Sequence, residues 1–315
     1  MPRECLAALT AVASYLPPRR VPIAELAGPA RLNAMQVRLF QRVFGLAEVR
    51  LDPHGSLLDL LAGAVERLDE LRGQEHRVRF VLHGRSMPVA VPYPQNPLHE
   101  LCRRTGLGHA IAFTVTQQAC ASGLLALDLA GRLLAGCDDP DALALVLTGE
   151  KTFTYDTRVI PGTTLFGEGA AACLVSRTGP HDRVLAYVSR QYGEFDGRVS
   201  MSPELLSAFG KAYPRLLSEV LLAAVGQAGM DLADIALVLP HNVNTVSWIR
   251  LSRALGLPVD RVLLDNVPIS GHGFCADAFI NYVTAVNLGR LRPGDRYLIA
   301  AVGSGATFSA MVVEH

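Results

Sequence analysis

The 315-residue sequence lacks the features that mark several classes of protein. It has no excess of either charge, since 29 Lys and Arg are matched by 29 Asp and Glu, which gives no electrostatic footprint for nucleic acid or an anionic bilayer. No run reaches the roughly 18 uncharged apolar residues that a membrane-spanning helix needs. We therefore expect partners among small molecules and proteins, with no nucleic acid and no membrane.

The sequence also lacks any CxxC pair, and its six cysteines lie in apolar or small-residue surroundings. This usage is typical of a reducing compartment, so we predict a cytoplasmic protein. The apolar run at positions 5–16 follows Arg3 and weakly imitates a signal peptide, but we interpret it as a first β-strand that ends at the Pro17-Pro18 turn.

Half of the residues are apolar and 28 are glycine, a composition that favours a deep core with many tight turns. Short β-rich runs alternate with longer Ala- and Leu-rich segments, which predicts a layered α/β domain. The strands expected include 77–82, 110–116, 142–147 and 261–264. The helices expected include 56–72, 121–135 and 203–228.

Two parts of the sequence resemble each other. The run 141–149 is similar in pattern to 295–303, a separation of 154 positions, and strands ending at His83 and His241 are separated by 158. This period is far longer than that of a solenoid, so we predict two similar halves that share one core about a pseudo-dyad. The first half, 1–178, carries Cys120, and the second, 179–315, carries His241 and His272. His83 is interpreted as a relic of the duplication or a surface residue.

Cys120 is the first candidate for chemistry. It lies between an apolar strand and a long apolar helix, where unpaired N–H groups and the helix dipole favour a thiolate. A single cysteine is more often a small buried hydrophobe. The small residues at 119 and 121–123, however, leave room for a substrate beside the sulfur.

Five segments, taken in order, resemble proteins of the ketoacyl synthase III family. They are 14–26 (SYLPPRRVPIAEL), 118–123 (QACASG), 165–175 (LFGEGAAACLV, with Glu168 where most members have Asp), 241–244 (HNVN) and 303–308 (GSGATF). The resemblance implies a duplicated thiolase-type fold with five α/β/α/β/α layers, and a homodimer.

The resemblance also implies roles for individual residues. Cys120 would attack an acyl thioester, and its own N–H together with that of Ser304, beside Gly303, would form the oxyanion hole. His241 would hydrogen-bond the second substrate, and Asn244 would orient the loop that carries His241.

The main departure from the family is at His272, which stands where the catalytic Asn is expected. A second imidazole is compatible with decarboxylative condensation, because it can donate to a thioester carbonyl. It is equally compatible with general-base catalysis on an alcohol or amine, with Asp277 as an orienting carboxylate. Asp277 also has a simpler interpretation, as a solvated or helix-capping carboxylate.

The leading hypothesis is an acyltransferase that loads an acyl group from acyl-CoA or acyl carrier protein onto Cys120. It would then condense that group with a malonyl-type thioester, in fatty-acid-like or polyketide and secondary-metabolite biosynthesis. Acyl transfer to an alcohol or amine is the first alternative, and a catalytically silent partner subunit of a heteromeric condensing enzyme is the second. We predict no cofactor beyond the phosphopantetheine thioester of the substrate. We also predict no metal, because His272 and Cys275 form the only compact pair of zinc-type ligands.

Overall fold

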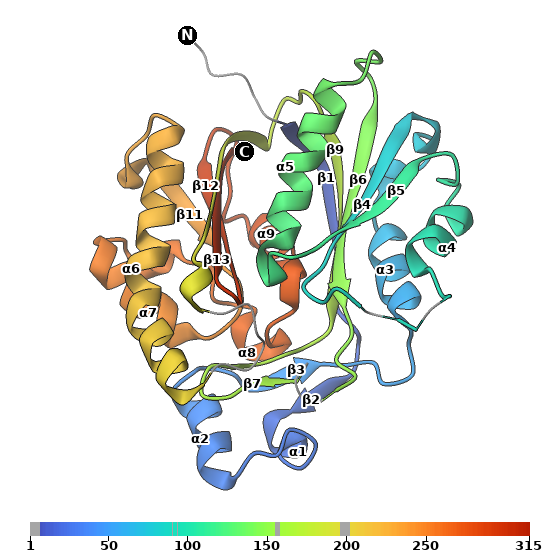
Figure 1. Cartoon of the computed structure of the whole chain (residues 1–315). Coiled ribbons are helices and arrows are strands. Elements are labelled where there is room, and N and C mark those ends of the chain that lie inside the picture. The colour runs from blue at the N-terminus through green and yellow to red at the C-terminus, as the bar shows by residue number, and fades with distance from the viewer. Residues whose placement is uncertain (1–6, 90, 93, 155–157, 196–201) are drawn as a thin grey trace.

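The computed structural model describes residues 7–89, 91–92, 94–154, 158–195 and 202–315 (Figure 1). Nine strands form one hydrogen-bonded sheet, in the order β11-β12-β13-β10-β1-β9-β6-β4-β5. The strands of the N-terminal part are β1 (Ala7–Tyr15), β4 (Val78–Gly84), β5 (Ile111–Val115), β6 (Leu143–Glu150) and β9 (Gly169–Ser176). Those of the C-terminal part are β10 (Arg183–Gln191), β11 (Ile235–Leu239), β12 (Arg296–Gly303) and β13 (Thr307–Glu314).

The two parts of the sheet have the same strand order, except that the first has one additional strand, β5. In the first, β5, β4 and β6 run parallel, and β9 and then β1 are added antiparallel. In the second, β11 and β12 run parallel, and β13 and then β10 are added antiparallel. Among the described residues, the two parts are joined in the sheet by two residue pairs between β1 and β10. The boundary predicted between residues 178 and 179 falls in the connection from β9 to β10, and the division of the chain there stays a prediction.

Helices complete five layers (Figure 1). Between the two parts of the sheet lie α5 (Ser122–Ala135) and α9 (Asp277–Asn287). One outer face is covered by α3 (Leu57–Val65) and α4 (Pro97–Arg104), and the other by α6 (Pro203–Gln227) and α7 (Thr245–Leu255). Three separate apolar cores fill the spaces between these layers, as the predicted α/β/α/β/α architecture requires. The predicted fold class is confirmed.

The central helices explain why the sequence around them is so apolar. Helix α5 is flanked by strands of both parts, so it buries side chains on nearly every side, among them Leu124, Leu127 and Leu134. Its buried carboxylate, Asp128, is paired with Arg132 at 2.7 Å. Both α5 and α9 begin near one end of the layers, where the loops that follow the parallel strands also lie.

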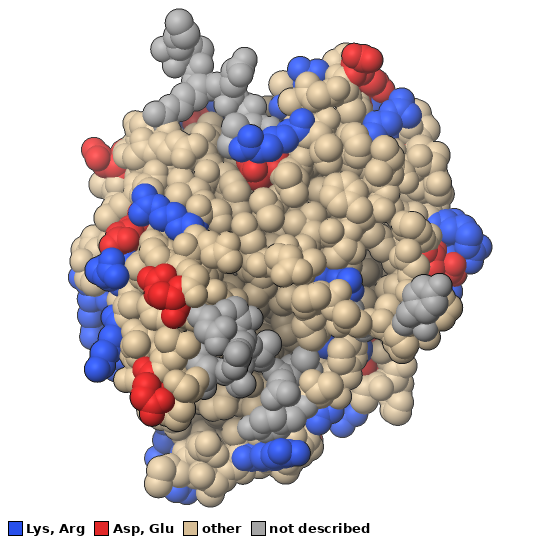
Figure 2. All heavy atoms as spheres, in the orientation of Figure 1, with Lys and Arg blue, Asp and Glu red and all other residues tan. Residues whose placement is uncertain are grey.

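Short elements cover the lower end of the molecule in Figure 1. They are β2 (Arg20–Pro22), α1 (Ile23–Leu26), α2 (Ala34–Arg42), β3 (Glu48–Arg50), β7 (Val159–Ile160), β8 (Thr164–Leu165) and α8 (Val267–Ser270). They enclose a small apolar core of their own. On the face shown in Figure 2, charged groups of both signs are scattered and neither forms a large patch. Within the described part of the chain, no helix is both long and apolar enough to cross a membrane.

Candidate active site

The turn that carries Cys120 has an unusual backbone. Between β5 and α5, the non-glycine residues Gln117 and Ala119 have φ values of 78° and 45°, in the left-handed region that side chains disfavour. The Ser122 hydroxyl accepts a hydrogen bond from the N–H of Gln118 at 3.2 Å and so closes the turn. Cys120 itself is 8% exposed, at the first turn of the helical segment. Local strain of this kind is typical of functional sites, and nothing in the sequence pattern indicated it.

His272 reaches Cys120 from the other part of the molecule. It follows α8 in an extended turn, where its N–H donates to Leu165 and its carbonyl accepts from Gly167. These two bonds fix the backbone, and the imidazole Nε2 then lies 3.2 Å from the Cys120 sulfur. The structure therefore brings together two residues that are 152 positions apart.

Asp277 holds the other side of the same imidazole. Its Oδ2 lies 2.5 Å from Nδ1 of His272 and also accepts from the Asn242 N–H at 2.6 Å. Its Oδ1 accepts from the Gly273 N–H at 2.6 Å. The carboxylate is 1% exposed, so it is not a solvated surface group. Cysteine, histidine and aspartate thus form a continuous chain, the arrangement in which a carboxylate orients an imidazole against a nucleophile.

The contacts among Cys120, His272 and Asp277 determine the charge of the His272 imidazole. Burial opposes a charge on His272, but the charges of Asp277 and Cys120, and the hydrogen bonds to both, outweigh it and raise the pKa of His272 to about 10. An imidazolium between a carboxylate and a sulfur atom is therefore the expected state of His272 at neutral pH.

His241 lies beside His272 but is held differently. The two ring centroids are 6.1 Å apart, and Nε2 of His241 lies 2.9 Å from the hydroxyl of Tyr213 on α6. The indole N–H of Trp248 donates to the His241 carbonyl at 3.0 Å. Burial, together with repulsion from His272, lowers the pKa of His241 to about 3, so this imidazole is neutral at physiological pH.

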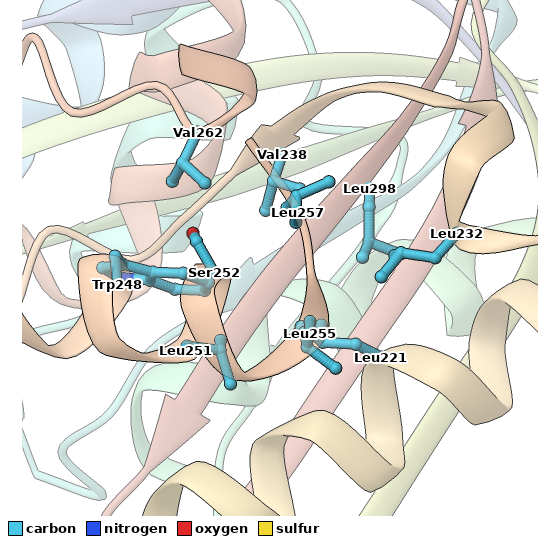
Figure 3. A pocket seen from close by; sticks show the side chains of 10 residues that line it. All are labelled: Leu221, Leu232, Val238, Trp248, Leu251, Ser252, Leu255, Leu257, Val262 and Leu298. Carbon is cyan, nitrogen blue, oxygen red and sulfur yellow. The ribbon is translucent and has the colours of Figure 1, made fainter. Parts of the chain in front are cut away.

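Trp248 is itself immobilised by apolar packing. Figure 3 shows its ring on α7 at a mostly aliphatic pocket, which α6, α7, β11, β12 and neighbouring loops line. None of the predicted site residues lines this pocket. The Trp248 ring also meets the His241 imidazole edge-on at 5.4 Å, so Trp248 holds both the backbone and the ring of His241.

The remaining predicted residues have supporting positions. Asn244 caps α7, accepting from the Ser247 N–H at 2.8 Å and donating to the Thr163 carbonyl at 3.1 Å, so it ties the histidine loop to a neighbouring hairpin. Gly303 packs on the nucleophile turn so tightly that a Cβ atom there would lie 2.0 Å from the carbonyl oxygen of Gln118. Ser304, in the same turn, is exposed. The oxyanion role of the Ser304 N–H stays a prediction.

Several side chains at the site were not identified from the sequence. The Ser86 hydroxyl lies 3.3 Å from the Cys120 sulfur and 3.6 Å from the Cys275 sulfur. The buried carboxylate of Glu150 accepts from the N–H groups of Ser86 and Met87 at 2.7 and 2.8 Å, and so fixes the loop after β4. Burial and the negative charges of Glu150 and Cys120 raise the pKa of Cys275 well above its usual value.

Two aromatic rings shield the histidine. Phe166 and Phe274 stack at 4.4 Å, and the Phe166 ring lies 4.9 Å from that of His272. Glu168 lies two residues after Phe166. Its carboxylate accepts a hydrogen bond from the ammonium group of the buried Lys151 at 2.6 Å and another from the Thr152 N–H. Among the residues that the structure describes, no group of three or more His, Cys, Asp or Glu side chains is placed to hold a metal ion.

Comparison with known proteins gives matches at the levels of sequence and of fold. The family described as "3-Oxoacyl-[acyl-carrier-protein (ACP)] synthase III C terminal" matches residues 225–315. A β-ketoacyl-[acyl-carrier-protein] synthase III of Rhizorhabdus wittichii is 31% identical over 231 residues, which cover 67% of this chain and 69% of the relative.

Solved structures extend the likeness to nearly the whole chain. The acyltransferase ChlB3 superposes with a TM-score of 0.85 at 22% identity, covering 98% of this chain and 97% of its own. The 3-oxoacyl-[acyl-carrier-protein] synthase III of Aquifex aeolicus superposes with a TM-score of 0.81 at 20% identity, covering 98% of this chain and all of its own. At these identities the structural matches establish the thiolase-type fold.

Proposed function

Since the chain belongs to the β-ketoacyl-[acyl-carrier-protein] synthase III family, we propose that it is an acyltransferase that carries an acyl group on Cys120 and passes it to a hydroxyl or amine acceptor. The observation that carries the proposal is the chain of contacts from Cys120 through His272 to Asp277. The donor is an acyl thioester of coenzyme A or of an acyl carrier protein, and the protein acts as a homodimer.

In the first step the Cys120 sulfur attacks the thioester carbonyl. A new carbon–sulfur bond forms, the carbonyl electrons move to oxygen, and the tetrahedral intermediate collapses as the donor thiol leaves. The His272 imidazolium, 3.2 Å from the sulfur, supplies the proton that the leaving thiolate needs. The N–H groups of Cys120 and Ser304 are the candidates for stabilising the oxyanion.

In the second step the acceptor attacks the acyl-enzyme. His272, now beside an uncharged thioester, takes the proton of the hydroxyl or amine at Nε2, and Asp277 stabilises the imidazolium that results. The tetrahedral intermediate then expels Cys120 as the leaving group. An aspartate at 2.5 Å from Nδ1 suits this role, because it both orients the ring and compensates its charge. The support for an oxygen or nitrogen acceptor lies in this carboxylate.

Decarboxylative condensation with a malonyl-type thioester is the second candidate for this step. It is favoured by the name of the Rhizorhabdus relative and by His241, which belongs to the His-x-x-Asn motif of the family. Condensation shares the loading of Cys120 with acyl transfer to oxygen or nitrogen, and it differs in the nucleophile that attacks the acyl-enzyme in the second step. A catalytically silent subunit is disfavoured, because the contacts that activate Cys120 are retained.

The test separates the two steps. The protein and its Cys120→Ala variant are incubated with a panel of acyl thioesters on coenzyme A and on carrier protein, and intact mass is recorded. We expect an acyl adduct only where Cys120 is present, and no adduct with any donor would refute the proposal. The acyl-enzyme is then chased with amines, with alcohols and with malonyl thioester, and the loss of the adduct identifies the acceptor class.

A further inference from the structure

We propose that Tyr213 determines the acceptor class, because its hydroxyl occupies Nε2 of His241 and so withholds that nitrogen from a malonyl thioester. Carbon–carbon bond formation is thereby disfavoured, while transfer to oxygen or nitrogen through His272 is left open. The inference rests on the proposed function and assigns its selectivity to one residue of α6.

The contact between Tyr213 and His241 is held from several sides. The hydroxyl lies 2.9 Å from Nε2. The phenol ring meets Phe209 edge-on at 5.7 Å and Phe308 at 5.6 Å, so it is packed in an aromatic cluster and is not free to swing away. On the other side, Trp248 anchors the His241 backbone at 3.0 Å. Both partners are therefore held relative to each other by aromatic packing.

Decarboxylation makes a specific demand that this arrangement does not meet. When the bond between the α-carbon and the carboxylate of a malonyl thioester breaks, carbon dioxide leaves and the electron pair moves onto the thioester oxygen as an enolate. That oxygen needs a hydrogen-bond donor aimed at it. If Nε2 of His241 accepts from Tyr213 it carries no proton, because the ring proton is then on Nδ1, on the side of the Ala300 backbone. If Nε2 donates to Tyr213, its proton is already used.

The other imidazole is also committed. Nδ1 of His272 faces Asp277 and Nε2 faces Cys120. A hydroxyl or amine acceptor needs a base only, which His272 provides once Cys120 is acylated. An enolate needs an additional donor, which Tyr213 keeps occupied.

The matched pair of variants is Tyr213→Phe and Tyr192→Phe. Each removes one hydroxyl from the same aromatic cluster, but the Tyr192 hydroxyl faces Glu219 at 3.5 Å and does not contact His241. Carbon dioxide release from a carboxyl-labelled malonyl thioester is measured for both variants and for the wild type. We expect Tyr213→Phe to release it at least about tenfold faster than the other two, since a positioned donor is worth that much or more. Adding His241→Ala to Tyr213→Phe should abolish the gain.

Equal rates in all three proteins, or a gain that survives His241→Ala, would overturn the inference. Because decarboxylation of malonyl thioester to acetyl thioester takes up one proton and needs no acyl group on Cys120, the assay is run on unacylated protein as well. A failure to load Cys120 would then refute the proposed function and still leave the Tyr213 comparison decisive. Nitrogen-15 shifts of the histidine rings give a readout without turnover, since His241 should change in Tyr213→Phe and stay unchanged in Tyr192→Phe.

Discussion

Replacing Asp277 by asparagine tests the site at the residue on which the proposed acceptor chemistry depends. The change removes one negative charge from a carboxylate that meets Nδ1 of His272 and accepts from two backbone N–H groups. Without that charge, burial is opposed only by Cys120, so the pKa of His272 falls well below its wild-type value of about 10. The amide keeps only one oxygen, so either Nδ1 of His272 or a backbone N–H group loses its acceptor.

The magnitude follows from both effects. Loss of the orienting carboxylate in a nucleophile–imidazole–carboxylate set typically reduces turnover by about 10⁴-fold, and we expect a loss of about 10³- to 10⁴-fold, or about 4 to 5.5 kcal/mol of transition-state stabilisation. At pH 6 the wild-type imidazole is protonated and faces the Cys120 sulfur, whereas in Asp277→Asn a larger fraction of the imidazole is neutral. Alkylation of Cys120 by iodoacetamide, followed by intact mass from pH 5 to 10, should therefore be much slower in the variant at the acidic end.

The control is Asp128→Asn on α5, which makes the same chemical change in a buried carboxylate paired with Arg132, away from Cys120. It should leave the alkylation profile unchanged. An Asp277→Asn profile that coincides with that of the wild type would show that Asp277 does not control the charge of His272, and the argument for an orienting carboxylate would fail.

Further predictions concern stability and packing. Burial lowers the pKa of His83 to about 4, so between pH 6.5 and 4 the unfolded chain binds one proton more than the folded chain, and the free energy of unfolding decreases as the pH falls. In His83→Gln this decrease should be smaller by about 1.4 kcal/mol per pH unit, as measured by urea unfolding. Asp182→Ala should cost about 3 to 5 kcal/mol, because the buried carboxylate accepts from two tyrosines and two histidines, whereas Tyr282→Phe should cost about 1 to 2; equal losses would contradict a shared cluster. Gly303→Ala should slow alkylation of the nucleophile by about 100-fold by displacing its turn, while Gly226→Ala, with open space around it, should not; an active Gly303→Ala variant would count against close packing there.

Local patterns predicted the elements that depend on local forces. The helix expected at 121–135 begins at Ser122 and ends at Ala135, and the helix expected at 203–228 spans Pro203–Gln227. Both have strong apolar content, and the second has a serine cap followed by proline. Helix α4 was missed although the Asn96-Pro97 pair, a cap followed by proline at the first turn, was a usable signal.

Elements governed by tertiary packing were predicted less well. The helix expected at 56–72 ends at Val65, because Leu68 and Leu71 turn inward to the outer core instead of continuing along one helical face. The strand expected at 261–264 is reduced to one bridge between Val238 and Val262, after a 3₁₀ turn. His83, interpreted as a relic or a surface residue, is 2% exposed and bonds the Gly149 carbonyl at 3.0 Å. These outcomes depend on contacts with residues far away in the sequence, and no local sequence pattern shows which residues those are.

The site divides in the same way. The position of Cys120 at a helix start among small neighbours could be predicted, because both features are local, and its role as nucleophile stays a prediction. The role of Asp277 could not be decided from sequence, since an orienting carboxylate and a capping carboxylate look alike until the ring of His272 is in place. Tyr213 gave no signal at all, because it is one of two aromatic residues in a 25-residue helix and matches no motif. Glu150 gave a weak one, as a charge at the end of an otherwise apolar strand.

The reactive group is divided between two distant stretches of chain, with the sulfur at the start of α5 and the imidazole and carboxylate just before and at the start of α9. Neither stretch can form the contact until the strands that carry both helices have paired and closed the central layer. Contacts of such large sequence separation form late, because the entropy of closing the long loop must be overcome first. The rate at which Cys120 reacts with an alkylating reagent at mildly acidic pH therefore reports when this contact forms during refolding. We expect that reactivity to appear only after the helical circular dichroism signal has recovered.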